Sequence, residues 1–497
     1  MRRERGASSG LGEAFAERPA ADGHDLTVVA RREDRYRPIG DYAFLGDCHT
    51  GALVSSDGSV DWLCLPRLDD GSYFGRLLDR ERGGWCAVTP TDPAARRSRR
   101  YLDGTLVLQT EMATPGGRVR VTDCLTMRPG GAQRPYRQLL RVVDGLQGAV
   151  DLRVEVAPRF DYGQVRPWIR RNGRVWQALG GDDGLVIEGD VPLALSGLHD
   201  LVAEVRVHAG QRLRLSVRHT RPEVLDGSRT GPPGPGELDR RLEQTIAWWR
   251  GWSARGGRLG QDQAAAVRSA TVLKALTQAT TGAIAAAATT SLPEAPGGSR
   301  NWDYRASWVR DSVFALRSLA ELGYTAEADG FRRFVQRSAA GSADELQIVY
   351  GLGGERRLVE LTPGDGLEGA EGAFVACTFW LAECLARQGR TAEARAAFAR
   401  ASATANDLGL FAEEFDPATG TLLGNFPQAL THLSHVAAAV ALEEASRWAV
   451  NGRRAAAWVR AGPRSDGPVG PQGAVGQPAG HDRQPVGQQP EGQHPGD

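Results

Sequence analysis

The spacing of apolar and polar positions divides the chain into a strand-rich first half and a helix-rich second half. In the first half, short runs alternate between apolar and polar residues and end at turns rich in Gly, Asp and Pro, as strands do. Leu152–Val156 alternates cleanly, and Thr105–Met112 and Arg118–Asp123 flank a turn at Pro115–Gly117. Because no crossover helix interrupts this series, the pattern predicts an antiparallel β-sandwich over residues 37–225.

In the second half, apolar residues recur at helical spacing. A Pro/Gly-rich linker and a helix at Glu237–Ser253 occupy residues 226–258 and lead into this region. The six further helices predicted are Gln261–Gln278, Asp311–Leu322, Ala326–Ser338, Ala373–Gln388, Ala392–Asn406 and Gln428–Ala449. They predict an all-α domain of paired helices over residues 259–450, so the fold class is multidomain, β followed by α.

Three tryptophans, Trp248, Trp249 and Trp252, lie close together in the linker helix. Such a cluster could hold a ligand, but a stripe of this kind more often packs one domain against another. Packing is therefore the favoured interpretation.

The two ends of the chain differ from the rest. Residues 1–36 are polar and aperiodic, and residues 461–497 are rich in Gly, Pro and Gln, so both ends are predicted to be disordered. The first residues lack the ~7–15-residue apolar core of a signal peptide, and no apolar run approaches the ~20 residues of a membrane span. These features predict a cytoplasmic protein.

Composition narrows the possible partners. The chain has 60 basic and 60 acidic residues, so charge favours neither nucleic acid nor an anionic membrane as a partner. The 6 cysteines show no CxxC spacing, and most lie in apolar segments, which indicates small core residues rather than a metal site.

The stretch Arg300–Asp311 concentrates aromatic, arginine and aspartate residues. It follows a polar loop, Thr289–Gly298, and precedes apolar residues at helical spacing, so it lies on a loop that enters a helix. Aromatic faces stack on the apolar side of a sugar ring, and carboxylate and guanidinium groups bind its hydroxyls, so the stretch favours a sugar site. The alternative is a buried structural corner in which Asp311 is a helix N-cap.

An acidic pair, Glu413 and Glu414, lies in the segment Phe411–Pro417. Inverting hydrolysis of a glycosidic bond needs one carboxyl group to protonate the leaving oxygen and another to activate water, ~6.5–9.5 Å apart. The pair could supply the base, or it could be solvated surface. Further on, His432 and His435 could ligate a metal, but no third ligand is nearby, so a capping or core role is favoured.

The motif NWDYR at residues 301–305, followed by WxRD at residues 308–311, resembles the signature of family-15 glycoside hydrolases. This family contains glucoamylases, glucodextranases and bacterial α,α-trehalases. Phe411–Pro417 and the helix start at Gly424–Ala429 are similar to the general-base loop of the family and the segment after it. Ala43–Pro66 resembles the opening of the N-terminal domain of its trehalase-like members.

The resemblance implies an (α/α)6 toroid with a substrate pocket at one end, and inverting hydrolysis that requires no metal or organic cofactor. Carried over position by position, it implies Glu413 as the general base. The residues that it assigns to substrate binding are Tyr304, Trp308, Arg310, Asp311 and Glu371. Of these, the WxRD residues are expected to hold the sugar in the deepest subsite, and Glu371 is expected at the pocket rim.

The chain departs from the family pattern where the general acid is expected, because no Gly-Ile-Trp-Glu-like segment is found. Residues 346–361 lead directly into residues 363–370, where the family has a long block of helices. Twelve helices of ~11–12 residues with their connections need at least ~200 residues, which the helical region does not provide once its long loop is subtracted. We therefore predict an internal deletion and an incomplete toroid, with Glu360, Glu368 and Glu371 as the carboxylates near the join.

Taken together, these features predict a family-15-type hydrolase of α-glucosidic bonds in trehalose or maltooligosaccharides, with a small carbohydrate as its partner. The alternative is a catalytically impaired, internally deleted remnant that at most binds sugar. A carboxylate facing Glu413 across a pocket would favour the enzyme. The sequence leaves open the choice between the two sugars and the oligomeric state.

Overall fold

The structure is a computed structural model that describes residues 36–227, 233–257, 259–294, 303–338, 346–358 and 372–461. The chain divides into two compact units, Met1–Arg447 and Trp448–Asp497. The predicted disordered ends lie outside the described residues except for their innermost positions, Tyr36 and Ala461. Glu360, Glu368 and Glu371 also lie outside them, so their predicted place near the site stays a prediction.

The first part of the chain forms strands, as the alternating pattern predicts. These are β1 (Tyr42–Gly46), β2 (Gly51–Ser55), β3 (Ser59–Cys64), β4 (Ser72–Phe74), β5 (Trp85–Pro90), β6 (Arg96–Tyr101), β7 (Leu108–Thr114), β8 (Gly117–Leu125), β9 (Gln138–Ala157), β10 (Trp168–Asn172), β11 (Val175–Gly180), β12 (Asp183–Gly189), β13 (Ala194–Ser196), β14 (Asp200–His208) and β15 (Arg212–His219). Every ladder between these strands is antiparallel.

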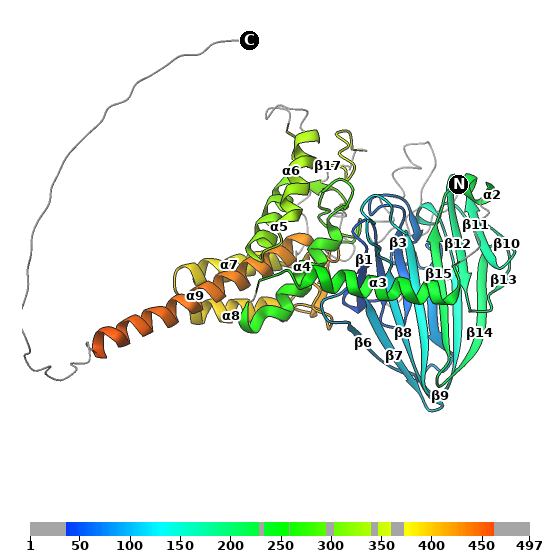
Figure 1. Cartoon of the computed structure of the whole chain (residues 1–497), viewed down its shortest axis with the longest axis horizontal. Helices are drawn as coiled ribbons and strands as arrows, with labels where there is room; N and C mark the ends of the chain where they lie inside the picture. Colours follow the sequence, from blue (N-terminus) through cyan, green and yellow to red (C-terminus); the bar gives the residue numbers. More distant parts are fainter. Residues whose placement is uncertain are drawn as a thin grey trace, which may run out of the picture. The chain divides into compact units, whose positions relative to one another are not determined.

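The long strand β9 joins the two layers of this domain (Figure 1). Its first part pairs with β8 and β15, and its second part pairs with β5 and β14. From β15 one layer continues through β12 and β11 to β10, and from β5 the other continues through β3 and β2 to β1. The predicted antiparallel β-sandwich is therefore confirmed.

Helix α3 (Pro235–Ser253) follows the short helix α2 (Pro222–Gly227) and lies along the sandwich (Figure 1). Its residues Leu238 and Leu242 pack on buried side chains of β8 and β9. Trp249 and Trp252 are buried, and the Trp252 ring stacks on Tyr324 with 4.1 Å between ring centroids. The packing interpretation of the tryptophan cluster is therefore confirmed.

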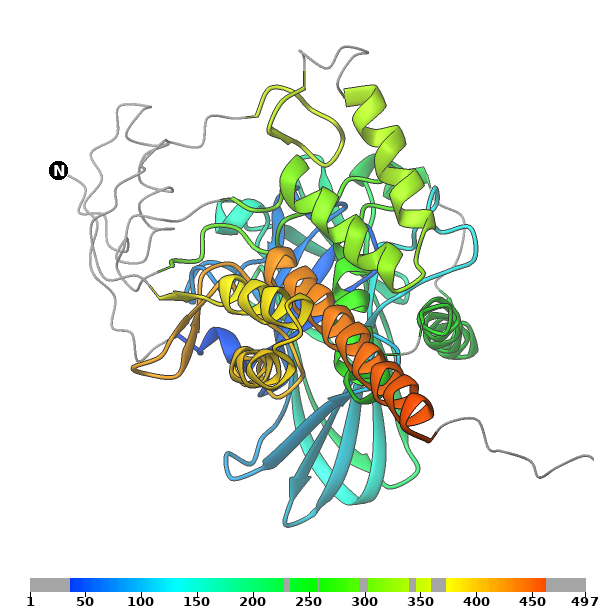
Figure 2. The same ribbon diagram turned by 90° about the vertical axis from the view of Figure 1, so that its left-hand side faces the viewer.

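All six predicted helices of the second half are present. They are α4 (Gln263–Leu276), α5 (Val309–Glu321), α6 (Ala326–Ser338), α7 (Val375–Arg387), α8 (Thr391–Ser402) and α9 (Ala429–Ala461). Helices α5 and α6 form one antiparallel pair, and α7 and α8 form another (Figures 1 and 2). The incompleteness of a toroid built from such pairs stays a prediction.

Two small sheets lie among these helices; the first contains Trp308, and a strand of the second begins directly after Glu413. One pairs β16 (Ser307–Trp308) with β17 (Val349–Tyr350), and the other joins β18 (Ala373–Phe374), β19 (Glu414–Asp416) and β20 (Thr421–Leu423). Because Ala373 and Phe374 belong to β18, α7 begins at Val375, two positions later than predicted.

The sandwich and the helices of the first unit share one hydrophobic core. The Trp62 indole on β3 donates a hydrogen bond to the backbone oxygen of Ala288, in the loop before the candidate site, over 3.0 Å. The sandwich therefore helps to fix the loop that leads into the site. None of the helices in the described part of the chain combines the length and apolar character that a bilayer span requires.

Candidate functional site

The described part of the polar loop that precedes the aromatic stretch, residues 289–294, is mostly buried. Thr289 is fully buried, and its hydroxyl donates to Asn425 Oδ1 over 3.0 Å and accepts from the Phe426 N–H over 3.0 Å. The Gly424 N–H donates to the Pro293 oxygen over 2.8 Å. These bonds satisfy the polar groups of the loop and attach it to the segment that follows the acidic pair.

Glu413 is 3% exposed and Glu414 is 6% exposed, so the acidic pair is not solvated surface. One carboxyl oxygen of Glu413, Oε2, accepts from the Asn425 N–H over 3.1 Å. The Tyr304 hydroxyl also donates to this carboxyl group. Two donors from distant parts of the chain therefore fix the side chain of the predicted general base.

Gly424 makes room for this carboxyl group. A Cβ added at Gly424 would lie 2.6 Å from Glu413 Oε2, and the residue has a φ of +72°. Both the close approach and the left-handed backbone favour glycine. The turn between β20 and α9 is thus shaped around the predicted base.

The pKa of Glu413 is raised to about 8. Burial is the largest cause, because it disfavours the charged form, and the negative charge of Glu294 is the next. The hydrogen bonds from the Asn425 N–H and Tyr304 act in the opposite direction. Burial and the charge of Glu413 likewise raise the pKa of Tyr304, so its hydroxyl stays a donor.

Glu294 is the carboxylate in the described part of the chain that acts most strongly on Glu413, and sequence reasoning missed it as a site residue. It lies within the polar loop and is 9% exposed. The one signal in the sequence is its place in the loop directly before the aromatic stretch. The contacts that bury this loop come from residues far away in the sequence, so the signal is weak.

The residues of the WxRD motif lie at the start of α5. The ring of Trp308 meets the Tyr304 ring edge-on, with 6.3 Å between centroids. The Arg310 guanidinium lies 5.9 Å from the Trp308 ring centroid and donates to Asp311 Oδ2 over 3.1 and 3.2 Å. The structure therefore brings Tyr304, Trp308, Arg310 and Asp311 together.

One polar group of this motif lacks a partner within the described part of the chain, and one carboxyl group is partly removed from water. The Trp308 indole N–H is buried and has no hydrogen-bond partner among the described residues. Burial raises the pKa of Asp311, while the charge of Arg310 opposes that rise. Trp308, not Asp311, occupies the N-cap position of α5, so the N-cap interpretation of Asp311 is wrong. An unpaired buried donor beside an arginine–carboxylate pair suits a ligand rich in hydroxyl groups.

Two other residues of the motif have a structural role. The buried Arg305 guanidinium pairs with Asp303 at 2.7 Å and donates to the backbone oxygens of Leu68 and Asp70. It also donates to the Tyr162 hydroxyl. The buried-corner interpretation therefore holds for Asp303 and Arg305, which anchor the loop, and the sugar-binding role of the later residues stays a prediction.

The two histidines pack in the core. The Phe411 N–H donates to His432 Nε2 over 3.2 Å, so the proton of the neutral His432 ring lies on Nδ1, which donates to Ser269 Oγ over 2.9 Å. Ser269 is also 3.1 Å from His435 Nδ1. Burial lowers the pKa of both rings, which confirms the core role. No group of three possible metal-ligating side chains occurs within the described ranges.

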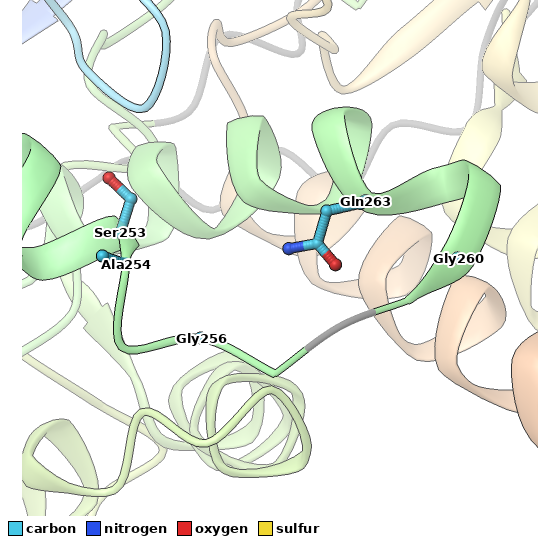
Figure 3. A pocket seen from close by; sticks show the side chains of 5 residues that line it. All are labelled: Ser253, Ala254, Gly256, Gly260 and Gln263. Carbon is cyan, nitrogen blue, oxygen red and sulfur yellow. The ribbon is translucent and has the colours of Figure 1, made fainter.

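A hollow of about 360 Å³ lies between the end of α3 and the start of α4 (Figure 3). Its polar side chains are already used: Ser253 Oγ donates to the Trp249 oxygen over 2.6 Å, and Gln263 Oε1 accepts from the Leu259 N–H over 2.6 Å. Its lining includes none of the candidate site residues. This hollow is therefore separate from the candidate site.

Comparison with known sequences matches both halves of the chain. The family profile described as "Trehalase-like, N-terminal" matches residues 32–203, and the profile described as "Glycosyl hydrolases family 15" matches residues 260–369 and 355–440. The trehalase of Mycolicibacterium smegmatis is 36% identical over 382 residues, which cover 69% of this chain and 55% of that protein. The trehalase of Mycobacterium tuberculosis is 37% identical over 355 residues, which cover 65% of this chain and 50% of that protein.

The chain therefore spans about half the length of the curated relatives it matches. Among solved structures, a bacterial glucoamylase complexed with acarbose aligns with a TM-score of 0.44 and 10% sequence identity. That alignment covers 75% of this chain and 59% of the glucoamylase.

Proposed function

The chain belongs to glycoside hydrolase family 15, and from this premise we propose that it hydrolyses the α-glucosidic bond of trehalose with inversion. The named relatives are trehalases, and this supports trehalose over maltooligosaccharides as the substrate. The N-terminal match to the trehalase-like profile supports the same choice.

In the proposed reaction, Glu413 takes a proton from a water molecule as the water oxygen attacks the anomeric carbon. The bond from this carbon to the leaving oxygen breaks on the opposite face, and the leaving oxygen takes up a proton from a second acid. The described residues do not assign that acid. The Asn425 N–H and the Tyr304 hydroxyl hold Glu413 in place for the proton transfer.

The WxRD residues would bind the glucose unit. The Trp308 ring offers a face for stacking, and its unpaired indole N–H can donate to a sugar oxygen. Arg310 and Asp311 offer a charged donor and a charged acceptor for hydroxyl groups. Glu371, at the predicted rim, and Tyr304 complete the proposed set.

One observation carries the proposal. The buried carboxyl group of Glu413 accepts a hydrogen bond from Tyr304, which belongs to the other family motif. Two motifs that are far apart in the sequence thereby meet at a carboxyl group with a shifted pKa, as expected of a catalytic base.

The test is the release of glucose from trehalose and from maltotriose, followed by NMR so that the anomers are resolved. Inversion yields one α- and one β-glucose from each trehalose. We expect Glu413→Gln to lower the rate about 10²–10⁴-fold, and Glu188→Gln, which changes a buried glutamate in the sandwich, to leave it unchanged. Equal rates for wild type and Glu413→Gln would refute the role of Glu413.

Sugar binding without hydrolysis is the second candidate function. The family-15 profile matches in two segments that overlap at residues 355–369 rather than as one continuous match, and the described residues provide no assigned proton donor. Calorimetric titration with trehalose separates the two candidates: binding without any glucose release would favour the remnant, and measurable release that depends on Glu413 would favour the enzyme.

A further inference from the structure

The start of α9 holds the segment that carries the predicted base. The Phe411 N–H donates to His432 Nε2 over 3.2 Å, and the Phe411 oxygen accepts from the Gln428 N–H over 3.0 Å. Phe411 lies two positions before Glu413 in the chain. Both backbone groups of Phe411 are therefore fixed by α9 and the residue directly before it.

The same short segment is also held at its other end. The Glu413 N–H donates to the Asn425 oxygen over 3.2 Å, and the Asn425 N–H donates to Glu413 Oε2 over 3.1 Å. Ala412, between the two ends, is 1% exposed. A buried segment of three residues that is bound at both ends has little room to adjust, so a shift at Phe411 is passed on to the Glu413 carboxyl group.

A buried serine fixes which nitrogen of the His432 ring accepts this bond. Because a backbone N–H can only donate, Nε2 is the acceptor, and the ring proton lies on Nδ1, which donates to Ser269 Oγ on α4 over 2.9 Å. The Ser269 hydroxyl hydrogen then points to His435 Nδ1, 3.1 Å away. Ser269 and His432 are both 0% exposed, so water does not compete for these groups.

Packing alone does not account for a histidine at position 432. The His432 ring meets the Phe411 ring edge-on, with 5.1 Å between centroids, and an apolar ring could make the same contact. An apolar ring would, however, leave the Phe411 N–H without its acceptor in a residue that is 3% exposed. A buried donor without a partner is unfavourable, so the segment would move to find one.

We propose that His432 is a positioning residue for Glu413. Its Nε2 holds the Phe411 N–H, and Ser269 holds the ring in the tautomer that can accept this bond. The inference rests on the proposed function, in which Glu413 is the general base. His432 itself does not touch the carboxyl group and acts through the backbone of the segment from Phe411 to Glu413.

Two amide variants separate the two nitrogens of His432. In His432→Gln the side-chain oxygen can take the place of Nε2, whereas in His432→Asn the shorter amide reaches only the place of Nδ1. We expect His432→Asn to lower kcat for glucose release from trehalose about a hundredfold with KM within about twofold, because the base moves and the sugar-binding residues do not. His432→Gln should keep kcat within about tenfold of wild type.

The matched control is His435→Asn, the same change on the same helix. The His435 ring is as buried as that of His432, but it bonds to Ser269 rather than to the backbone of Phe411. We expect kcat of this variant to stay close to that of wild type. A fall in kcat as large as that of His432→Asn would show that any polar change in this part of the core disturbs the site, and it would overturn the proposal.

A second readout does not need catalysis. The Asn425 N–H donates to Glu413 Oε2, so its hydrogen exchange, followed by NMR, reports on the placement of that carboxyl group. In His432→Asn we expect exchange at Phe411 and Asn425 to become about tenfold faster or more, while amides of β9 in the sandwich stay unchanged. In His432→Gln and His435→Asn, exchange at both positions should stay near that of wild type.

If His432→Asn does not fold, Ser269→Ala takes its place, because it removes the acceptor that holds the Nδ1 proton. Exchange at Phe411 and Asn425 should again become faster. Unchanged exchange at Asn425 in the folded variant, or equal effects of His432→Gln and His432→Asn, would overturn the proposal. The expected exchange pattern in a chain that releases no glucose would leave the positioning of Glu413 standing and refute only the proposed hydrolysis.

Discussion

At Glu413, burial and a second carboxylate give a glutamate a pKa of about 8 in the folded chain, against an ordinary value of 4.5. Between these two pH values the folded state holds a proton that the unfolded state releases. Stability should therefore fall as pH rises from about 4.5 to about 8 and change no further from this cause above it.

Replacing Glu413 with glutamine removes this penalty, since an amide cannot ionise. We predict that Glu413→Gln is more stable than wild type at about pH 9 by roughly 1–3 kcal/mol, and that the difference disappears near pH 4. Urea unfolding of both proteins across this range measures the effect. Glu204→Gln, at a side chain that is 70% exposed, serves as the control, and a difference that is constant with pH would contradict the prediction.

Trp308 offers a different residue-scale test, because its indole N–H is buried without a partner among the described residues. Trp308→Phe keeps an aromatic face but removes this donor. We predict about tenfold weaker trehalose binding, from the loss of one hydrogen bond, with little change in stability. Calorimetry and thermal unfolding measure the two quantities.

Trp252→Phe is the matched comparison for Trp308→Phe. The Trp252 indole donates to Glu327 Oε1 over 2.9 Å in the core, so its loss should cost about 1–3 kcal/mol of stability. Sugar binding by the folded Trp252→Phe protein should not change. The reverse pattern, with Trp308→Phe destabilised and binding intact, would show that Trp308 is a packing residue.

At the scale of elements, the β19–β20 hairpin and the turn after it hold the predicted base. Gly420 and Gly424 in this segment share a left-handed backbone, with φ of +74° and +72°. A Cβ at Gly420 would meet nothing within 4 Å, whereas one at Gly424 would press on the Glu413 carboxyl group. A comparison of alanine variants at the two positions therefore separates the effect of backbone strain from the effect of displacing the base.

We predict that Gly420→Ala and Gly424→Ala each lose about 1–2 kcal/mol of stability from backbone strain. Only Gly424→Ala should also lose function, by about a hundredfold in glucose release, because a small displacement of a catalytic group is costly. Thermal unfolding and the glucose assay measure the two effects. Equal activity in the two variants would mean that the position of Glu413 does not depend on Gly424.

Many of the elements could be predicted from periodicity, because strands such as β7 and helices such as α6 bury mainly one face. The hairpin of β7 and β8 and the helix α6 lie where the pattern places them. The burial of the polar loop could not be predicted in this way. Thr289 finds its partner Asn425 136 positions away, and a local pattern contains no sign of such a bond.

Contacts between residues that are far apart in the sequence also explain which site residues could be predicted and which could not. Tyr304, Trp308, Arg310, Asp311 and Glu413 lie in motifs that could be recognised, and the structure brings their segments together. Glu294 lies in a stretch that reads as an ordinary polar loop. Its burial and its effect on the pKa of Glu413 depend on the three-dimensional arrangement.

At the scale of the whole molecule, the described helices leave one apolar surface uncovered. Val313 and Phe314 on α5, and Trp380 and Leu381 on α7, are between 39% and 52% exposed. The two helices are neighbours, since Arg317 on α5 lies 3.8 Å from Glu383 on α7. We call these four residues the α5–α7 face. Such a cluster of exposed apolar side chains is unusual for a folded surface and is expected where a ring of helices lacks members.

If the toroid is incomplete, the α5–α7 face is open to water. We then predict that Phe314→Ser combined with Leu381→Ser reduces the binding of a hydrophobic dye to the folded protein several-fold. The free energy of unfolding should change by only about 0.5 kcal/mol, because exposed side chains contribute little to it. Leu198→Ser, at a leucine that is 71% exposed on the sandwich, is the control and should alter neither quantity. A loss of several kcal/mol in the double variant would instead mean that this face is packed against other parts of the chain, and the prediction of an incomplete toroid would then be wrong.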